Sequence, residues 1–254
     1  MHEDVIACAS IVERGDPDRF RATMASSAKA RERLFPIYAF NVEVSRVTWM
    51  TREAMVAEMR LQWWREALCK IRNGDSVGRH EIATSLADVL DRRGAELLDE
   101  LVEARKWDIH REPFAGMDAM QDYLRSTSGN LMVAAARALG DCVEVSASDA
   151  GFGMGIAGWL CAVPALIGSG RHPLVDASPD SIRSLANTGL SALEKARKTG
   201  AGKTAFPAML AAWKSAPVLR MAVKSPKRAL DGRLGLSPVA GRLSLIAKAA
   251  LGRW

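Results

Sequence analysis

Residues 53–72 read EAMVAEMRLQWWREALCKIR, and this stretch decides the fold class. Charged and polar residues follow one side of it, as in a helix that buries its other face. Asn73-Gly74 comes directly afterwards, and a glycine in the left-handed conformation is a common helix stop. The sequence therefore predicts an amphipathic α-helix here. Its apolar side recurs every three or four positions, at Ala57, Leu61, Trp64, Leu68 and Ile71.

The same helical period continues through most of the chain, and no convincing alternation of apolar and polar residues predicts a strand. Ser178 is expected to cap a helix that opens at Pro179. We therefore expect an all-α fold, with helices arranged around a central core or cavity. Further helices are predicted over approximately 31–47, 81–92, 95–110, 117–139, 150–167, 179–198, 206–223 and 239–254.

Charge is divided unevenly along the 254 residues, which are otherwise 48% hydrophobic and 25% charged, as in an ordinary soluble globular chain. Up to Glu194 there are 22 basic and 28 acidic residues, whereas residues 195–254 hold 13 basic residues and only Asp231 as an acid. Such a basic end suits a membrane surface, nucleic acid, a phosphorylated ligand or the protein's own acidic part.

Several classes of protein are not indicated by the motifs. The four cysteines and four histidines lie far apart, without the spacing of a zinc site or a disulfide framework. No H-E-x-x-H or G-x-S-x-G motif is present, so neither a zinc hydrolase nor an α/β-hydrolase is indicated. The first apolar stretch stops at Val12 and resembles neither a signal nor a transit peptide. We expect a cytoplasmic location, which allows peripheral attachment to the inner face of a membrane.

Residues 150–170 form an uncharged stretch long enough to span a bilayer. Six glycines and Pro164 interrupt it, so we favour a helix buried tightly against its neighbours. Residues 153–158 also fit the G-x-G-x-x-G pattern of dinucleotide sites. That pattern needs a strand before it, and the surrounding helical period argues against one.

Two further features allow more than one interpretation. Asp118 and Asp122 lie one helical turn apart, as in some magnesium-binding prenyl-transfer enzymes, but without a second acidic helix we favour a solvated helix face. The last segment, 239–254, is a basic amphipathic helix that either lies on anionic lipid or docks on the bundle. Its predicted apolar side carries Leu243, Ile246, Ala250 and Trp254.

Several motifs, taken in chain order, resemble those of the squalene/phytoene synthase family. Together they extend to about Val223, so we expect a family domain over 1–223 and a basic extension with a short amphipathic helix over 224–254. The resemblance implies an isoprenoid-synthase-like helical bundle that encloses a deep central cavity. The motifs are Asp18-Arg19-Phe20, residues 34–44, residues 59–65, Tyr123 with Gly129, and Gly155-Ile156-Ala157 followed by Gly170-Arg171.

Active members of that family condense two prenyl diphosphates head to head and bind Mg²⁺ through two aspartate-rich motifs. In this chain the two aspartates of the first motif fall on Ser45 and Trp49. Without such oxygen ligands we expect no magnesium cluster, and diphosphate charge would be unstabilised. The polar positions of the second motif fall on Trp159, Ala162, Ala165 and Leu166.

The pattern is most similar to a divergent branch of the family, typified by a phytoene-synthase-like mitochondrial complex I assembly factor and its bacterial relatives. We therefore expect a catalytically degenerate binding or assembly factor for a membrane-associated process, either complex I-like assembly or isoprenoid metabolism, and no cofactor. The alternative is an active Mg²⁺-dependent prenyltransferase that condenses farnesyl or geranylgeranyl diphosphate through relocated acids such as Glu43, Asp118 and Asp122.

The resemblance also selects six residues that we expect to line or rigidify the former substrate cavity. No residue is assigned to catalysis or to metal binding. The expected partners are an anionic membrane surface or a membrane protein, contacted through the basic end, and an isoprenoid or lipid ligand. Nucleic acid is not expected, because the basic end has no aromatic platform for single strands. The six residues are Arg19, Tyr38, Arg60, Gln62, Trp63 and Trp64.

Overall fold

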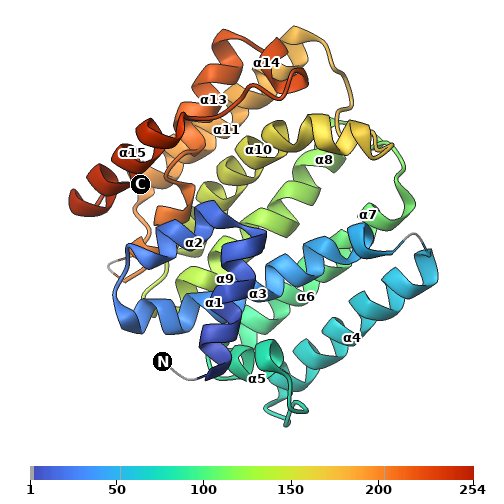
Figure 1. Ribbon diagram of the computed structural model, residues 1–254, viewed down its shortest axis with the longest axis vertical. Helices are drawn as coiled ribbons and strands as arrows, with labels where there is room; N and C mark the ends of the chain where they lie inside the picture. Colours follow the sequence, from blue (N-terminus) through green and yellow to red (C-terminus); the bar gives the residue numbers. More distant parts are fainter. Residues whose placement is uncertain (1–2, 52, 203) are drawn as a thin grey trace.

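A computed structural model describes residues 3–51, 53–202 and 204–254. Every regular element in these residues is helical, which confirms the all-α prediction (Figure 1). The elements are α1 (Glu3–Gly15), α2 (Pro17–Met24), α3 (Ala28–Met50), α4 (Ala54–Asn73), α5 (Glu81–Ala87), α6 (Arg92–Arg105), α7 (Trp107–His110), α8 (Met117–Leu124), η1 (Arg125–Gly129), α9 (Asn130–Ala138), α10 (Glu144–Gly168), α11 (Pro179–Thr199), α12 (Phe206–Met209), η2 (Leu210–Ala212), α13 (Ser215–Lys224), α14 (Lys227–Leu230) and α15 (Pro238–Ala250).

The sequence signals that begin and end helices act as expected. Gly74 follows α4 in the left-handed conformation, with φ of 77°. Before α11, the hydroxyl of Ser178 accepts a hydrogen bond from the backbone N–H of Ser181 at 3.2 Å, and Pro179 occupies the first helical position. The apolar side predicted for α4 is also the side that it buries, except that Ile71 is only partly covered.

Helix α10 runs through the middle of the molecule, where it packs against α9, α11 and α13 (Figure 1). It is long and apolar enough to cross a membrane, yet more than half of its residues are buried among other helices. The G-x-G-x-x-G pattern lies inside this helix, so its glycines serve helix packing. A Cβ atom at Gly153 would lie 2.6 Å from Leu193 Cγ and 2.8 Å from the carbonyl oxygen of Gly189.

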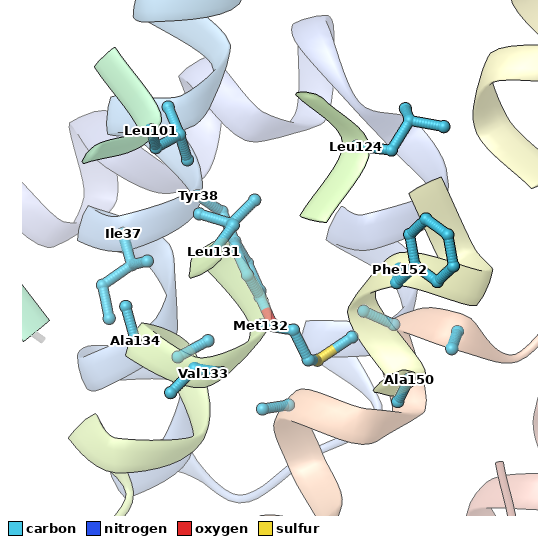
Figure 2. Packing of buried hydrophobic residues seen from close by; sticks show 14 of the residues in the cluster. Ile37, Tyr38, Leu101, Leu124, Leu131, Met132, Val133, Ala134, Ala150 and Phe152 are labelled. Atoms are coloured by element: carbon cyan, nitrogen blue, oxygen red, sulfur yellow. The ribbon is translucent and has the colours of Figure 1, made fainter. Parts of the chain in front are cut away.

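The centre of the core is formed where α3, α9 and α10 meet. Figure 2 shows Tyr38 of α3 beside Leu131 and Met132 of α9, with Phe152 of α10 nearby. These side chains are almost completely buried, so the three helices are held together mainly by removal of apolar surface from water.

Three predicted helices are interrupted in the structure. The helix expected over 206–223 is divided into α12, η2 and α13. The helix expected over 95–110 is divided into α6 and α7, and the one expected over 117–139 contains the π-helical turn η1. Turns of this kind are frequent at functional sites. Here the turn is possible because α10 has Gly151 opposite it, where a Cβ atom would lie only 2.4 Å from the carbonyl oxygen of Ser128. The N-terminal helices α1 and α2 were not predicted as separate elements.

The C-terminal segment packs on the bundle, but through a different side of α15 from the one predicted. Leu245 is buried in a small cluster with Trp213, whereas Leu243 and Ile246 are 62% and 64% exposed. The predicted apolar side therefore faces away from the bundle, apart from Trp254 at its end. The guanidinium of Arg197 lies over the Trp254 ring at 4.7 Å and donates to its carbonyl oxygen at 2.9 Å.

Candidate binding cavity

A cavity of about 390 Å³ lies in the interior of the bundle, between α2, α3, α10 and α13. The junction of α6, α7 and α8 forms another part of its wall, and η1 contributes Thr127 and Ser128. The wall combines charged groups with aromatic and aliphatic side chains. Its charged members are Asp16, Asp18, Arg19, Arg46, Arg105, Asp108, Arg171 and Lys214.

The two stretches where the family resemblance places metal-binding motifs face this cavity. Ser45 and Trp49 reach it from α3, and α10 contributes Trp159, Ala162 and Leu166. Ala165, the remaining position of the second motif, is exposed on α10. The Trp159 indole donates to the carbonyl oxygen of Pro173 at 2.7 Å. These walls are therefore largely apolar where oxygen ligands were expected.

Arg171 is turned into the cavity by the way α10 ends. Gly170 adopts a left-handed conformation with φ of 77°, and its N–H bonds to the carbonyl of Ile167 at 2.9 Å. The N–H of Arg171 bonds to the carbonyl of Leu166 at 3.0 Å. Together these two bonds form the Schellman motif that commonly closes a helix. The motif reverses the chain and leaves the Arg171 side chain only 4% exposed.

Asp108 is the centre of a buried polar network at the cavity wall. It forms ion pairs with Arg105 at 3.1 Å and with Arg171 at 3.5 Å. The hydroxyl of Tyr123 donates to the Asp108 carboxylate at 3.0 Å and accepts from Arg105 at 2.7 Å. Burial raises the pKa of Tyr123 far above its usual range, so the phenol stays protonated in alkaline solution as well. Arg171 also donates to Thr48 Oγ1 at 2.8 Å, which ties the network to α3.

The other two carboxylates of the wall also form ion pairs with basic side chains of the protein. Asp16 caps α2 by accepting from the backbone N–H of Arg19 at 3.0 Å, and it pairs with the Arg19 guanidinium at 2.6 Å. Asp18 forms ion pairs with Lys214 and, at 3.0 Å, with Arg21. Each carboxylate at the cavity wall thus has at least one cationic side chain as its partner.

The donor set of this cavity does not fit the magnesium ions that the resemblance implies. Mg²⁺ is held by carboxylates and water in octahedral geometry, and a cluster needs several acids from facing helices. Over the three described ranges, no group of three or more His, Cys, Asp or Glu side chains is placed to hold a metal ion. Asp118 and Asp122 are exposed on α8, and Glu43 lines a separate hollow. The relocated acids of the alternative therefore lie outside the central cavity.

The cavity also lacks an activated thiol. Cys161 lies in the wall, and burial raises its pKa. The thiolate is the nucleophilic form of cysteine, so Cys161 is placed as a packing residue.

The six residues selected from the resemblance lie apart from one another. Tyr38 is in the core, Gln62 is on the surface, and the other four line two separate hollows. Arg19 lines the central cavity, and its guanidinium lies 5.0 Å from the centre of the buried Tyr38 ring. Arg60, Trp63 and Trp64 instead line a second hollow of about 410 Å³ on the outside of α3 and α4. They do not line the central cavity, to which no residue of α4 contributes.

Neighbouring residues of this segment have different surroundings. Trp64 is buried and packs edge-on against Phe40 at 5.0 Å, whereas the neighbouring Trp63 is 44% exposed and lies 4.9 Å from the ring of His80. The two tryptophans thus divide between the core and a second surface, as their spacing on one helix predicts. Gln62 is exposed and donates to Glu66 at 3.2 Å.

Sequence reasoning missed most of the charged residues that define the cavity. Arg105 and Asp108 have the spacing of an exposed helical ion pair, so the sequence alone gives no sign that they are buried. Arg46 and Lys214 likewise resemble ordinary surface cations. Asp18, Arg19 and Arg171 are the exceptions, because they lie in motifs of the family resemblance. The glycine before Arg171 also marks a helix end.

Comparisons with known proteins can now be set beside this geometry. Residues 12–174 match the family model described as Squalene/phytoene synthase. The chain belongs to the squalene/phytoene synthase family. A crystal structure of a dehydrosqualene synthase in complex with ligand matches 98% of the chain and 96% of its own length, with a TM-score of 0.80 and 13% identity. A squalene synthase from Alicyclobacillus acidocaldarius matches 98% of the chain and 94% of its own, with a TM-score of 0.58 and 15% identity.

Related sequences include complex I assembly factors. The Drosophila melanogaster homolog of NADH dehydrogenase (ubiquinone) complex I assembly factor 6 is 28% identical over 179 residues, which cover 66% of this chain and 53% of that protein. The Homo sapiens assembly factor 6 is 24% identical over 162 residues, covering 62% and 48%. The chain thus spans about half the length of these relatives.

The buried network predicts a large effect for Asp108→Asn. Removing the carboxylate charge leaves two buried guanidinium groups without their counter-ion, so the free energy of unfolding should fall by about 3–5 kcal/mol. Urea unfolding followed by circular dichroism measures the change. Asp122→Asn, on the exposed side of α8, is the matched control and should leave stability nearly unchanged. Equal effects of the two substitutions would show that the network contributes nothing particular.

Proposed function

We propose that this squalene/phytoene synthase-like chain performs no head-to-head prenyl transfer and acts as a binding or assembly factor for a membrane-associated process. The observation that carries the proposal is the composition of the cavity wall. Ser45, Trp49 and Trp159 stand where metal-binding groups would be needed, and every carboxylate of the wall is paired with a cation of the chain. Diphosphate departure needs compensation of its developing charge, which this wall does not offer through metal ions.

The nature of the process is proposed from the relatives. The Drosophila and human proteins that the chain resembles are named as assembly factors of the ubiquinone-reducing NADH dehydrogenase, complex I. Their similarity covers 66% and 62% of this chain. We therefore propose that the chain acts in the assembly of a complex I-like respiratory enzyme. A role in isoprenoid metabolism is the second proposal.

Absence of prenyl transfer is tested directly on purified protein. Incubated with farnesyl or geranylgeranyl diphosphate and Mg²⁺, the chain is expected to release no pyrophosphate. Release that disappears in Glu43→Gln or in the Asp118→Asn/Asp122→Asn double variant would overturn the proposal in favour of an active enzyme with relocated acids.

For contact with the membrane we propose α15. Val239, Leu243 and Ile246 recur at helical spacing and are each more than 60% exposed, which forms an outward apolar stripe. Such a helix binds a bilayer when apolar burial is combined with attraction between basic residues and anionic lipid. The exposed cations of the same segment are Lys224, Lys227, Arg228, Arg233, Arg242 and Arg253.

The charge of this segment is not neutralised by the acidic part of the bundle. Among the described cations after Glu194, ion pairs are formed by Lys195, Lys198 and Lys214, and by none from position 220 onward. Partial burial, together with Arg197 and Arg220, lowers the pKa of Lys248 to about 8. Because these cations lie close together, we expect the segment to bind an anionic surface more strongly than a neutral one.

Deletion of the gene and complementation test both parts of this assignment. Deletion should lower the level and activity of respiratory complex I, and the wild-type gene should restore them. The Leu243→Asp/Ile246→Asp variant should fail to restore them and should bind vesicles containing phosphatidylserine roughly tenfold more weakly, because it loses apolar burial and adds repulsion. Ile6→Asp changes a half-exposed apolar residue of α1 and serves as the control.

The outcomes separate the two claims. An unchanged complex I after deletion would contradict the assembly role. Full complementation by the α15 variant, with unchanged vesicle binding, would contradict the membrane contact.

A further inference from the structure

The outward side of α4 carries an exposed row of large apolar side chains. Met55, Met59 and Trp63 follow one another at four-residue spacing, so they lie along the same side of the helix. Met55 and Met59 are 73% and 66% exposed. Met50, at the end of α3, extends the row, and its sulfur accepts from Arg60 Nη1 at 3.7 Å. We call Met50, Met55, Met59 and Trp63 the α4 patch, and a contiguous exposed apolar patch of this kind marks an interaction site.

Two hollows lie on either side of Trp63. The hollow of about 410 Å³ and a neighbouring one of about 300 Å³ share Trp63 and His80 in their walls. The ring of His80 is fixed, because its Nδ1 accepts from the backbone N–H groups of Ile82 and Ala83 at 3.2 and 3.3 Å. It lies 4.9 Å from the Trp63 ring, which is thereby held in place before a partner binds. A fixed aromatic ring between two hollows suits the apolar side chains of a helix laid against α4.

The charge left over at these hollows is positive. Arg60 at one hollow, and Lys70 and Arg79 at the other, are exposed and form no ion pair with any described residue. The acids of the two walls are Glu43 and Glu66, and Glu66 already accepts a hydrogen bond from a neighbouring side chain of α4. A partner that carries carboxylates beside its apolar side chains therefore complements this surface.

The position of the α4 patch favours a protein partner over a lipid surface. Helices α4 and α15 lie at opposite ends of the molecule, so a membrane that contacts α15 does not reach the patch (Figure 1). Glu53 and Glu58 lie at the start of α4 beside Met55, and anionic lipid repels carboxylates. Glu58 is 3.8 Å from His110 of α7, on the other side of the row from the two hollows. A partner's carboxylates are therefore expected on the side of the hollows.

We propose that the α4 patch binds an amphipathic helix of a partner protein, with apolar side chains in the two hollows and carboxylates facing Arg60, Lys70 and Arg79. This inference rests on the proposed role as a binding or assembly factor, for which it gives the chemistry of a partner. The surface is separate from the central cavity, to which no residue of α4 contributes.

Fluorescence anisotropy of labelled synthetic helices, titrated with the whole chain, tests the proposal. One peptide carries leucine on one side and glutamate on the other, and its counterpart carries lysine in place of glutamate. The acidic peptide should bind roughly tenfold more tightly than the basic one, because charges of like sign across an interface repel. Equal binding of the two peptides, or tighter binding of the basic one, would overturn the inference.

Met59→Glu is the informative variant, because Met59 is exposed and lies outside the core. It should weaken binding of the acidic peptide roughly tenfold or more, as expected for a residue at the centre of an interface. Met24→Glu makes the same change at an exposed methionine of α2 and should leave binding unchanged. Circular dichroism verifies that both variants fold. Equal peptide binding by the two variants would show that the patch is not the binding surface.

The charge assignment has its own variant. Lys70→Glu/Arg79→Glu reverses the charge at one hollow, so the chain should then prefer the lysine peptide. A double variant that still prefers the acidic peptide would contradict the assigned orientation of the partner.

Other occupants of the patch give different results. Weaker binding of Met59→Glu to vesicles containing phosphatidylserine would assign the patch to the membrane. A dimer that dissociates on this substitution, measured by sedimentation, would assign it to a second copy of the chain. Either result would overturn the inference.

Complementation separates this inference from the proposed function. In the deletion strain, Met59→Glu should fail to restore complex I while its vesicle binding stays intact, and full restoration would contradict the inference. An unchanged complex I after deletion would refute the assembly role alone, because the peptide titrations decide the surface independently of it.

Discussion

The shape of the cavity depends on the buried ion pairs between Asp108 and the two arginines, Arg105 and Arg171. Charges removed from water are tolerated in a protein interior only when they are paired and hydrogen-bonded. Their geometry therefore restricts how the surrounding helices are arranged. Through these residues and Tyr123, the end of α6, the short α7, α8 and the loop after α10 meet at one point, and Thr48 connects them to α3.

This network lies within the family fold, but the side chains at the centre of the fold differ from those that the family motifs imply. The chain superposes on a dehydrosqualene synthase over nearly its whole length, so the helical framework is shared. Fold alone does not determine function, which resides in the side chains that the fold brings together. In this chain α3 and α10 bring together tryptophan, serine, alanine and leucine, with guanidinium groups beside them. The same framework thus encloses a cationic and apolar space.

Much of the fold was predictable from the sequence, because helical periodicity and end signals are local. The buried side of α4, the stop at Gly74 and the start at Pro179 required only neighbouring residues. The site was less predictable, because the sequence does not distinguish a charge that faces a cavity from one that faces water. Arg105 and Asp108 have the spacing of a surface pair, yet the break between α6 and α7 turns Asp108 inward. On α15, packing against the bundle buries Leu245, whereas the predicted apolar side with Leu243 and Ile246 stays exposed.

We propose that the central cavity holds no metal cluster, because each carboxylate of its wall is paired with a cation of the chain. Anomalous diffraction at the manganese edge tests it, on crystals grown with Mn²⁺ and a non-hydrolysable farnesyl diphosphate analogue. We predict no manganese peak in the central cavity. Two or more manganese ions bridging the head group to side chains of α3 or α10 would contradict the account.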